Sequence, residues 1–241
     1  MSGALPGRLV ALEGVDGCGK TTQAARLAGA LDALLTHEPG ATPLGAAIRR
    51  LLLHGDAGAG AADTAGDASG AISGASAAPV PRAEALLMAA DRAQHVTAVV
   101  RPALRAGRWV VTDRFSGSTL AYQGYGRGLP LDGLRAVVDW AADDVTPDLS
   151  VLIDVSPATA RSRLAPVAPD RLEQLDEAFF ARVRDGYLAL AHGDPMRWVV
   201  LDGDVAPDTV ADAVLDAVGM RLGLPSSRSS GARSGAVGEG T

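Results

Sequence analysis

Residues 8–22, RLVALEGVDGCGKTT, restrict the fold more than any other stretch of this sequence. The run from Arg8 to Glu13 is short and apolar, which is typical of a buried β-strand. The next eight residues fit the pattern G-x-x-x-x-G-K-[ST], and TTQAARLAGAL then spaces its apolar residues as a helix does. A strand, a glycine-rich loop and a helix in this order predict a phosphate-binding loop, in which backbone N–H groups and a helix N-terminus surround phosphate oxygens.

The loop and the start of its helix supply the expected nucleotide-binding residues, which are Gly14, Val15, Asp16, Gly17, Cys18, Gly19, Lys20, Thr21 and Thr22. Lys20 is expected to reach the β- and γ-phosphates of a bound nucleotide, and the Thr21 hydroxyl to hold Mg²⁺. Lys20 is also the only lysine of the chain. A compact ammonium group suits this position better than a planar guanidinium. A chance glycine turn before a helix is the alternative, and the flanking strand and helix argue against it.

Composition limits the remaining classes of protein. The length of 241 residues suits one α/β domain or at most two small ones, and 47% apolar residues are ample for a core. A net charge of −6 argues against a broad nucleic-acid surface. The single cysteine excludes an internal disulfide framework, and neither a signal peptide nor an apolar run of membrane-spanning length is apparent. We therefore expect a cytoplasmic protein with a small-molecule substrate and no nucleic-acid or membrane partner.

The rest of the chain is expected to alternate strands and helices, which favours a parallel sheet. The first helix is expected to end at Gly29, and residues 124–128 to form a loop. The pattern predicts further strands over 34–36, 109–112, 149–154 and 198–201, and helices over 44–53, 82–100, 102–106, 116–122, 131–142, 157–164, 170–191 and 207–222.

Three stretches carry no such pattern. Residues 55–81 are almost entirely Ala, Gly, Ser and Asp, so they cannot bury enough apolar surface to offset their chain entropy, and we expect a flexible insertion. The sequence APVAP at 165–169 predicts a mobile loop, and the Ser/Gly/Arg-rich tail 225–241 is expected to be disordered. The domain is therefore expected to span residues 1–224.

Two further groups of residues have the chemistry of phosphoryl transfer. Asp113 and Arg114 follow an apolar strand, where a carboxylate can hold the Mg²⁺ hydration shell and a guanidinium can bind a phosphate. A surface salt bridge is the alternative interpretation of this pair. Arg161, Arg163 and Arg171 flank the loop 165–169, where cations could close over a transferring group. The alternative for these three is a solvated helical face.

Several segments, in order, resemble the thymidylate kinase family. They are GVDGCGKTT, HEPGATPLGAAIR, ALLMAADRAQH, DRFSGSTLAYQGYGRG, PDLSVLIDV and DRLE, and they span residues 8 to about 218. DRFSGSTLAYQGYGRG is the most specific segment. The resemblance implies a P-loop nucleoside monophosphate kinase-like α/β fold, with a five-stranded parallel sheet wrapped by helices. It implies transfer of the ATP γ-phosphoryl group to thymidine monophosphate (dTMP) with Mg²⁺, usually by a homodimer.

The resemblance also implies residue roles. Lys20, Arg114 and a lid around 161–171, with Arg161, Arg163 and Arg171, would be catalytic, and Thr21 and Asp113 would bind the metal. The implied dTMP contacts are Asp16 (sugar 3′-OH), Glu38 and Pro39 (acceptor-side loop), Arg49 and Arg114 (phosphate), Met88 (thymine face), Arg92 (thymine O4), Ser118 and Thr119 (near N3), Tyr122 (sugar) and Gln123 (a further contact).

The chain departs from the family at four places. His37 replaces an arginine, Met88 replaces a phenylalanine that stacks on thymine, the lid centre is APVAP where an arginine is common, and the link before the second strand is short. Another nucleoside monophosphate kinase, a deoxynucleoside kinase or a relative without turnover are the alternatives. A kinase for a free nucleoside would not need both Arg49 and Arg114. A guanine-binding switch would need an Asn-Lys-x-Asp segment, and the chain has no asparagine.

Overall fold

The computed structural model describes residues 7–54, 79–164 and 176–224. In this part of the chain, five strands form one sheet in the order β2-β3-β1-β4-β5, and every pairing is parallel. The predicted fold class is therefore confirmed. The strands are β1 (Leu9–Glu13), β2 (Leu34–His37), β3 (Val110–Asp113), β4 (Leu149–Asp154) and β5 (Trp198–Asp202).

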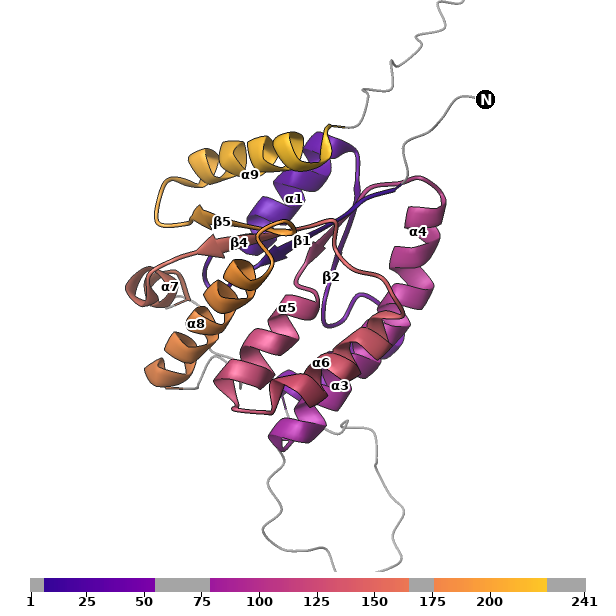
Figure 1. Cartoon of the computed structure of the whole chain (residues 1–241), viewed down its shortest axis with the longest axis vertical. Coiled ribbons are helices and arrows are strands. Elements are labelled where there is room, and N and C mark those ends of the chain that lie inside the picture. The colour runs from indigo at the N-terminus through magenta and orange to yellow at the C-terminus, as the bar shows by residue number, and fades with distance from the viewer. Residues whose placement is uncertain (1–6, 55–78, 165–175, 225–241) are drawn as a thin grey trace, which may run out of the picture.

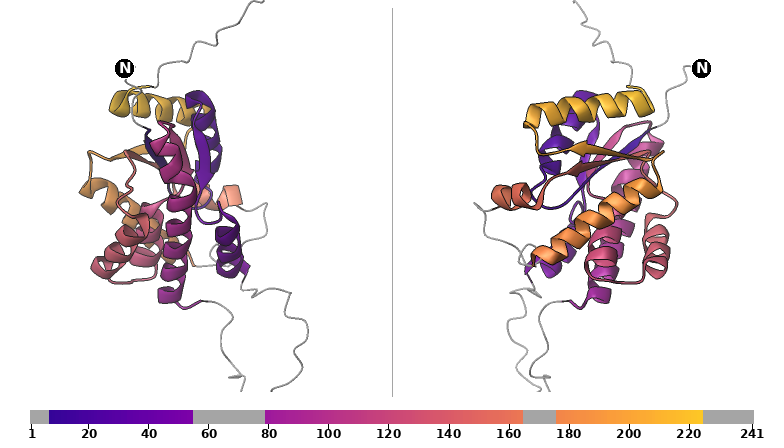
Figure 2. Two further views of the ribbon diagram at one scale, coloured as in Figure 1. Left: turned by 90° about the vertical axis from the view of Figure 1, so that its right-hand side faces the viewer. Right: turned by 60° about the vertical axis from the view of Figure 1, so that its left-hand side comes forward.

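Helices cover both faces of this sheet, with α1 and α9 on one face and α3, α5 and α8 on the other (Figures 1 and 2). Two π-helical segments, η1 (Val96–Val100) and η2 (Leu120–Gly126), continue α3 and α5. The α-helices are α1 (Lys20–Leu31), α2 (Pro43–His54), α3 (Pro81–His95), α4 (Arg101–Arg105), α5 (Ser116–Thr119), α6 (Leu131–Ala142), α7 (Pro157–Leu164), α8 (Glu177–Gly193) and α9 (Pro207–Leu222).

The central strand β1 has fully buried side chains on both faces, as expected of a strand inside a parallel sheet. Val10 and Leu12 belong to the core cluster that includes residues of α1 and α9. Leu9 and Ala11 belong to a second cluster with residues of η1 and α4. This two-sided burial fixes β1, and with it the start of the phosphate-binding loop at the carboxyl edge of the sheet.

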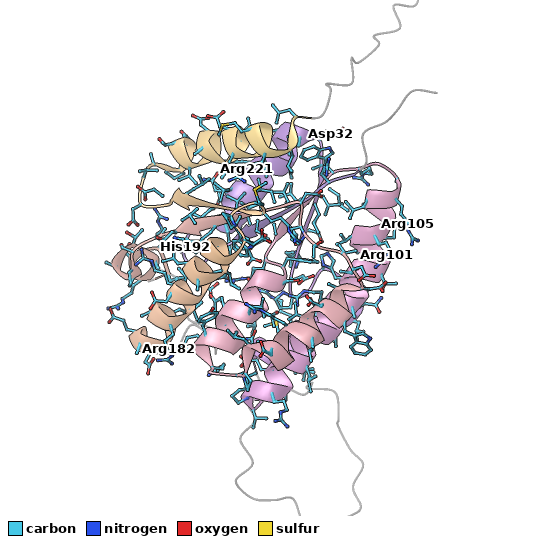
Figure 3. The ribbon with its side chains drawn as sticks, viewed as in Figure 1. Asp32, Arg101, Arg105, Arg182, His192 and Arg221 are labelled. Carbon is cyan, nitrogen blue, oxygen red and sulfur yellow. The ribbon has the colours of Figure 1, made fainter. Side chains whose placement is uncertain are left out.

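The structure corrects two expected boundaries. The first helix does not end at Gly29 but continues to Leu31, and Asp32, in the left-handed conformation, terminates it (Figure 3). Gly29 has open space around it, so the helix tolerates it without requiring its conformational freedom. Residues 124–128 are not all loop, because η2 extends to Gly126. The 3.6-residue pattern cannot distinguish an α-helix from the wider π-helical turn.

Four other predicted segments lie partly or wholly outside the described residues. Of the insertion 55–81, only the end is described, where Val80 caps α3 and Pro81 begins it. The helix expected over 170–191 is described from Glu177, after Asp176 accepts the backbone N–H of Phe179 at 2.7 Å as its N-cap. The loop 165–169 and the tail 225–241 are not described. No helix in the described part of the chain is long and apolar enough to cross a membrane.

Candidate active site

The glycine-rich loop has the backbone conformation that its sequence predicts. Gly14, Gly17 and Gly19 have φ angles of 144°, 80° and 94°, and α1 begins immediately afterwards at Lys20. A Cβ atom on Gly17 would lie 2.4 Å from the carbonyl oxygen of Ala160 in α7, so glycine is needed there for two independent reasons. The loop and the N-terminus of α1 together form a backbone site suited to a phosphate group.

Lys20 lies inside this loop and is almost completely buried. Its ammonium group donates to the backbone oxygen of Val15 at 3.2 Å and to Oδ1 of Asp16 at 3.4 Å. Burial alone would raise the pKa of Asp16, but Arg114, Lys20 and the hydroxyl of Tyr122 outweigh it, and the pKa is held well below its usual value. Asp16 is therefore an anion, and its carboxylate accepts hydrogen bonds from Lys20 in the loop, from Arg114 after β3 and from the hydroxyl of Tyr122.

Thr21 and Asp113 meet at the carboxyl edge of the sheet, as the sequence predicts. The Thr21 hydroxyl donates to Oδ2 of Asp113 at 2.5 Å, across 92 residues of chain. The other carboxylate oxygen of Asp113, Oδ1, is buried without a hydrogen-bond partner within the described residues. A hydroxyl oxygen beside an unsatisfied carboxylate oxygen is the kind of ligand pair that Mg²⁺ takes, so these two residues fit a magnesium ion.

Arg114 is surrounded by hydrogen-bond acceptors from four elements of the fold. It has a positive φ of 71° at the end of β3, and its guanidinium lies 4.9 Å from the centre of the Tyr122 ring. It forms a salt bridge with Asp16. Its other partners are the backbone oxygen of Gly14 (3.2 Å), the hydroxyl of Ser118 (3.1 Å), and the hydroxyls of Tyr187 (3.1 Å) and Tyr122 (3.2 Å).

A buried carboxylate, Glu13, lies behind Arg114. Its oxygens accept the hydroxyl of Ser118 at 2.6 Å and the backbone N–H of Phe115 at 3.1 Å, and the Tyr187 hydroxyl lies at 3.4 Å. Burial raises the pKa of Glu13 to about 7, although its hydrogen bonds and Arg114 oppose the increase. Ser118 and Tyr187 thus connect Glu13 to the guanidinium of Arg114.

A single cavity, with about 610 Å³ of open space, extends from Arg114 toward α2 and α3. Its lining contains all eleven side chains that the family resemblance assigns to the acceptor: Asp16, Glu38, Pro39, Arg49, Met88, Arg92, Arg114, Ser118, Thr119, Tyr122 and Gln123. Three more residues, Leu53, Asp91 and Phe115, complete it. The structure therefore brings together residues that the sequence separates by more than a hundred positions.

Arg92 lies in this cavity as one of the most deeply buried side chains of the chain. Its Nε donates to Oε2 of Glu38 at 3.0 Å, and its Nη2 donates to the Thr119 hydroxyl at 3.0 Å. Its third nitrogen, Nη1, is buried without a partner within the described residues. An unpaired buried donor is costly, by about 1–3 kcal/mol, unless a ligand supplies an acceptor.

The comparisons with known proteins agree with this geometry. A model of the thymidylate kinase family matches residues 12–214. A thymidylate kinase of Bifidobacterium longum (strain NCC 2705) is 45% identical over 213 residues, which are 86% of this chain and 95% of that protein. The chain belongs to the thymidylate kinase family. The thymidylate kinase of Prochlorococcus marinus (strain MIT 9303) is 43% identical over 220 residues, 87% of this chain and 93% of the relative.

A solved structure supports the same membership. The crystal structure of thymidylate kinase from Ehrlichia chaffeensis superimposes with a TM-score of 0.65 at 30% identity, and it covers 88% of this chain and 99% of the other. The resemblance seen in the sequence is therefore confirmed at the level of the family and of the fold.

The lid arginines that the thymidylate kinase resemblance implies do not all lie at the phosphate-binding loop. Arg163 donates to the backbone oxygen of Cys18 at 3.3 Å and to that of Gly203 at 3.0 Å, so it contacts the loop directly. Arg161 instead forms an exposed salt bridge with Glu177 at 2.8 Å. Arg171 lies outside the described residues.

Sequence reasoning missed several buried residues of this thymidylate kinase family site. The sequence around His95 predicts an isolated, ordinary residue of a helix or of the surface, but His95 is fully buried, with Nδ1 2.8 Å from Oε1 of Glu38 and Nε2 2.7 Å from the Thr36 hydroxyl. The prediction that it is isolated is wrong. His95 lies three residues after Arg92 on the same helix, a spacing that places both on one face, and this was the available signal. No sequence pattern indicated Tyr187, because its partners Arg114, Ser118 and Glu13 come from distant segments of the chain.

Proposed function

We propose that this protein transfers the γ-phosphoryl group of ATP to dTMP, with Mg²⁺, to give thymidine diphosphate. The observation that carries the proposal is the single cavity that contains Arg114 beside the phosphate-binding loop and Arg92 with its unpaired Nη1 nitrogen. The first arginine suits a phosphate, and the second suits the carbonyl of a base. One nucleoside monophosphate could place its phosphate at Arg114 and its base at Arg92.

On the donor side, the loop from Gly14 to Thr22 would bind the ATP phosphates, with Lys20 as its buried cation. Lys20 would exchange its contact with Asp16 for phosphate oxygens, since its ammonium can reach either. Thr21 and Asp113 would hold Mg²⁺. When bound, this ion neutralises charge on the β- and γ-phosphates.

On the acceptor side, Arg114 and Arg49 would bind the phosphate of dTMP. Arg49 lines the cavity and donates to the backbone oxygen of Pro39 at 3.0 Å, which directs it over the acceptor-side loop. His37 adds no cation here, because burial and the charge of Arg49 lower its pKa. The departure of His37 from the family pattern therefore leaves phosphate binding to these two arginines.

The chemistry needs positioning more than proton transfer. A phosphate monoester is largely a dianion at neutral pH, so its oxygen can attack the γ-phosphorus of ATP without a general base. Asp16 and Tyr122 would orient the sugar, Asp16 by accepting from the 3′-OH. Of the two lid arginines within the described residues, Arg163, at the backbone of the loop, would be the catalytic one, since Arg161 is held by Glu177.

The end of the cavity that contains Arg92 would bind the base and select it. Nη1 of Arg92 would donate to thymine O4, and Thr119 and Gln123, which line the cavity, would supply oxygens near N3. Ser118 is the weaker candidate, because its hydroxyl is engaged by Glu13 and Arg114. Met88 would pack on the face of the base with a flexible thioether in place of a ring.

We further propose that the protein is cytoplasmic, that its domain spans residues 1–224, and that it forms a homodimer. The homodimer is supported by large exposed apolar side chains on three helices that pack side by side, α2, α3 and α6. These side chains are Leu44 (52% exposed), Leu86 (53%) and Trp140 (85%). Large apolar side chains exposed on neighbouring helices are typical of association sites.

Initial rates of ATP-dependent phosphorylation of dTMP by the purified chain test the proposed activity. A separate candidate, another nucleoside monophosphate kinase, would show itself by a higher kcat/KM for a different monophosphate. A relative without turnover would bind ATP and dTMP in calorimetry and form no thymidine diphosphate.

A further inference from the structure

Gln123, in the lining of the cavity, has its amide fixed in one orientation. Its side chain is almost completely buried, and its Nε2 donates to Oε1 of Glu84 at 2.9 Å. A carboxylate can only accept here, so the nitrogen must face Glu84 and the amide oxygen must point the other way. That oxygen has no donor within the described residues.

Glu84 is itself held in place from the opposite side. It is fully buried, and Arg127 forms a salt bridge with it, donating from Nη2 to Oε2 at 3.0 Å and from Nε to Oε1 at 3.3 Å. The guanidinium of Arg127 lies 5.1 Å from the centre of the Phe179 ring in α8, and the backbone N–H of Arg127 donates to Tyr122. The carboxylate of Glu84 therefore lies between the donors of Gln123 and Arg127.

We propose that Glu84 is a positioning residue for base selection: it holds the Gln123 amide so that Oε1 presents an acceptor to the cavity, beside the donor Nη1 of Arg92. The proposal rests on the proposed function, since it concerns the base of the acceptor nucleotide. Glu84 is not among the residues that line the cavity, and it contacts the lining residue Gln123.

A donor beside an acceptor matches one edge of thymine. Thymine offers O4 as an acceptor and N3–H as a donor, whereas cytosine offers an amino donor and an unprotonated N3. With Gln123 reversed, its Nε2 and Nη1 of Arg92 would present two donors, and the N3–H of thymine would lose one of its two candidate acceptors, leaving the Thr119 hydroxyl. The orientation of one amide thus contributes to the preference between the two pyrimidines.

The substitution Glu84→Gln tests this. In E84Q, Arg127 would retain the amide oxygen of the new side chain, so its NH₂ group would face Gln123 and turn that amide around. We expect KM for dTMP to rise about tenfold, kcat to stay within about twofold, and the ratio of kcat/KM for dTMP to that for deoxycytidine monophosphate to fall about tenfold or more.

A double-mutant cycle separates this role from a general loss of structure. Q123A removes the amide, so E84Q added to Q123A should change KM for dTMP less than about twofold. D216N, which removes an exposed carboxylate of α9 that does not line the cavity, is the control and should leave both constants unchanged. The swap E84Q/Q123E restores an acceptor at position 123 and should return the dTMP preference to within about threefold of wild type.

Two outcomes would overturn the proposal. One is an E84Q enzyme with wild-type KM and wild-type preference; the other is an E84Q effect that persists in full in the Q123A background. If E84Q does not fold, the swap variant decides: its retention of the dTMP preference supports the role of Glu84, and its loss refutes it. Failure of wild type to phosphorylate dTMP would instead refute the proposed function.

Discussion

At the scale of single residues, Arg114 is the side chain on which the contacts of the site converge. Asp16 and Tyr122 hold one side of its guanidinium, and Ser118 and Tyr187 hold the other. A cation held by so many fixed acceptors is preorganised, because little reorganisation is needed when a phosphate arrives. The same arrangement explains why Arg114 adopts a positive φ angle that few arginines adopt.

Lys20 gives the most direct prediction at this scale. K20A removes the buried cation of the phosphate-binding loop, and we expect kcat/KM to fall by at least about 10²–10³. K20R should not restore it, because a planar guanidinium does not fit a pocket built for a compact ammonium. Circular dichroism would check that both variants fold, and activity near wild type in K20A would contradict the role of the loop.

Glu13 predicts a pH dependence of stability. Its folded-state pKa is raised to about 7 from 4.5, so the folded protein binds more protons than the unfolded chain between these values. Glu13 therefore lowers the free energy of unfolding progressively as the pH rises from about 4.5 to 7, by at most about 3 kcal/mol.

The difference between wild type and E13Q isolates this effect, since the titration of other groups cancels. Urea unfolding at pH 5 and pH 7.5 should show the unfolding free energy of wild type falling relative to that of E13Q. A difference between the two proteins that does not change with pH would mean that Glu13 has an ordinary pKa.

The residues that could be predicted from the sequence are those in local motifs. The phosphate-binding loop, Asp113 and Arg114 have fixed spacings, and the acceptor residues followed from a family resemblance. Glu13, His95 and Glu84 were missed because their partners lie 105, 57 and 39 positions away. No spacing rule relates such pairs, and each is an ordinary strand or helix residue by pattern.

At the scale of elements, α7 connects the phosphate-binding loop to the rest of the site. Ala160 lies against Gly17, and Arg163 reaches the backbone of the loop from the same helix.

If Arg163 stabilises the transferring group, R163A should lower kcat by about 10³ or more and weaken ATP binding much less. R161A is the matched control on α7, and kcat should stay within about twofold. Equal kcat in both variants and wild type would exclude α7 as the source of the catalytic arginine.

The elements themselves were mostly predictable, and the reason is visible in the core. β1 begins with four consecutive apolar residues and is followed by a glycine-rich loop, and α9 follows a 3.6-residue period. The π-helical segments were not predictable. In η2 the wider turn carries Tyr122 and Gln123 toward the cavity, and its geometry depends on packing against α8, where Gly126 lies against Phe179.

At the scale of the whole molecule, the face formed by α2, α3 and α6 predicts the homodimer. W140E places a charge on its most exposed apolar side chain, and we expect the protein to become monomeric at micromolar concentration. M220E is the matched control, because Met220 is 82% exposed on α9, across the sheet (Figure 1). Light scattering after gel filtration measures the mass, and a wild-type monomer, or a dimer that survives W140E, would contradict the assignment.

The central claim is that the cavity between Arg114 and Arg92 selects dTMP as the phosphoryl acceptor. Its most direct test is kcat/KM for each nucleoside monophosphate with ATP and Mg²⁺. We predict the highest value for dTMP and a value about 10–100-fold lower for deoxyuridine monophosphate, which lacks one methyl group. Deoxycytidine monophosphate should be at least about 100-fold lower than dTMP, since its amino group faces the donor of Arg92. No turnover of dTMP, or a higher kcat/KM for any other monophosphate, would contradict this account.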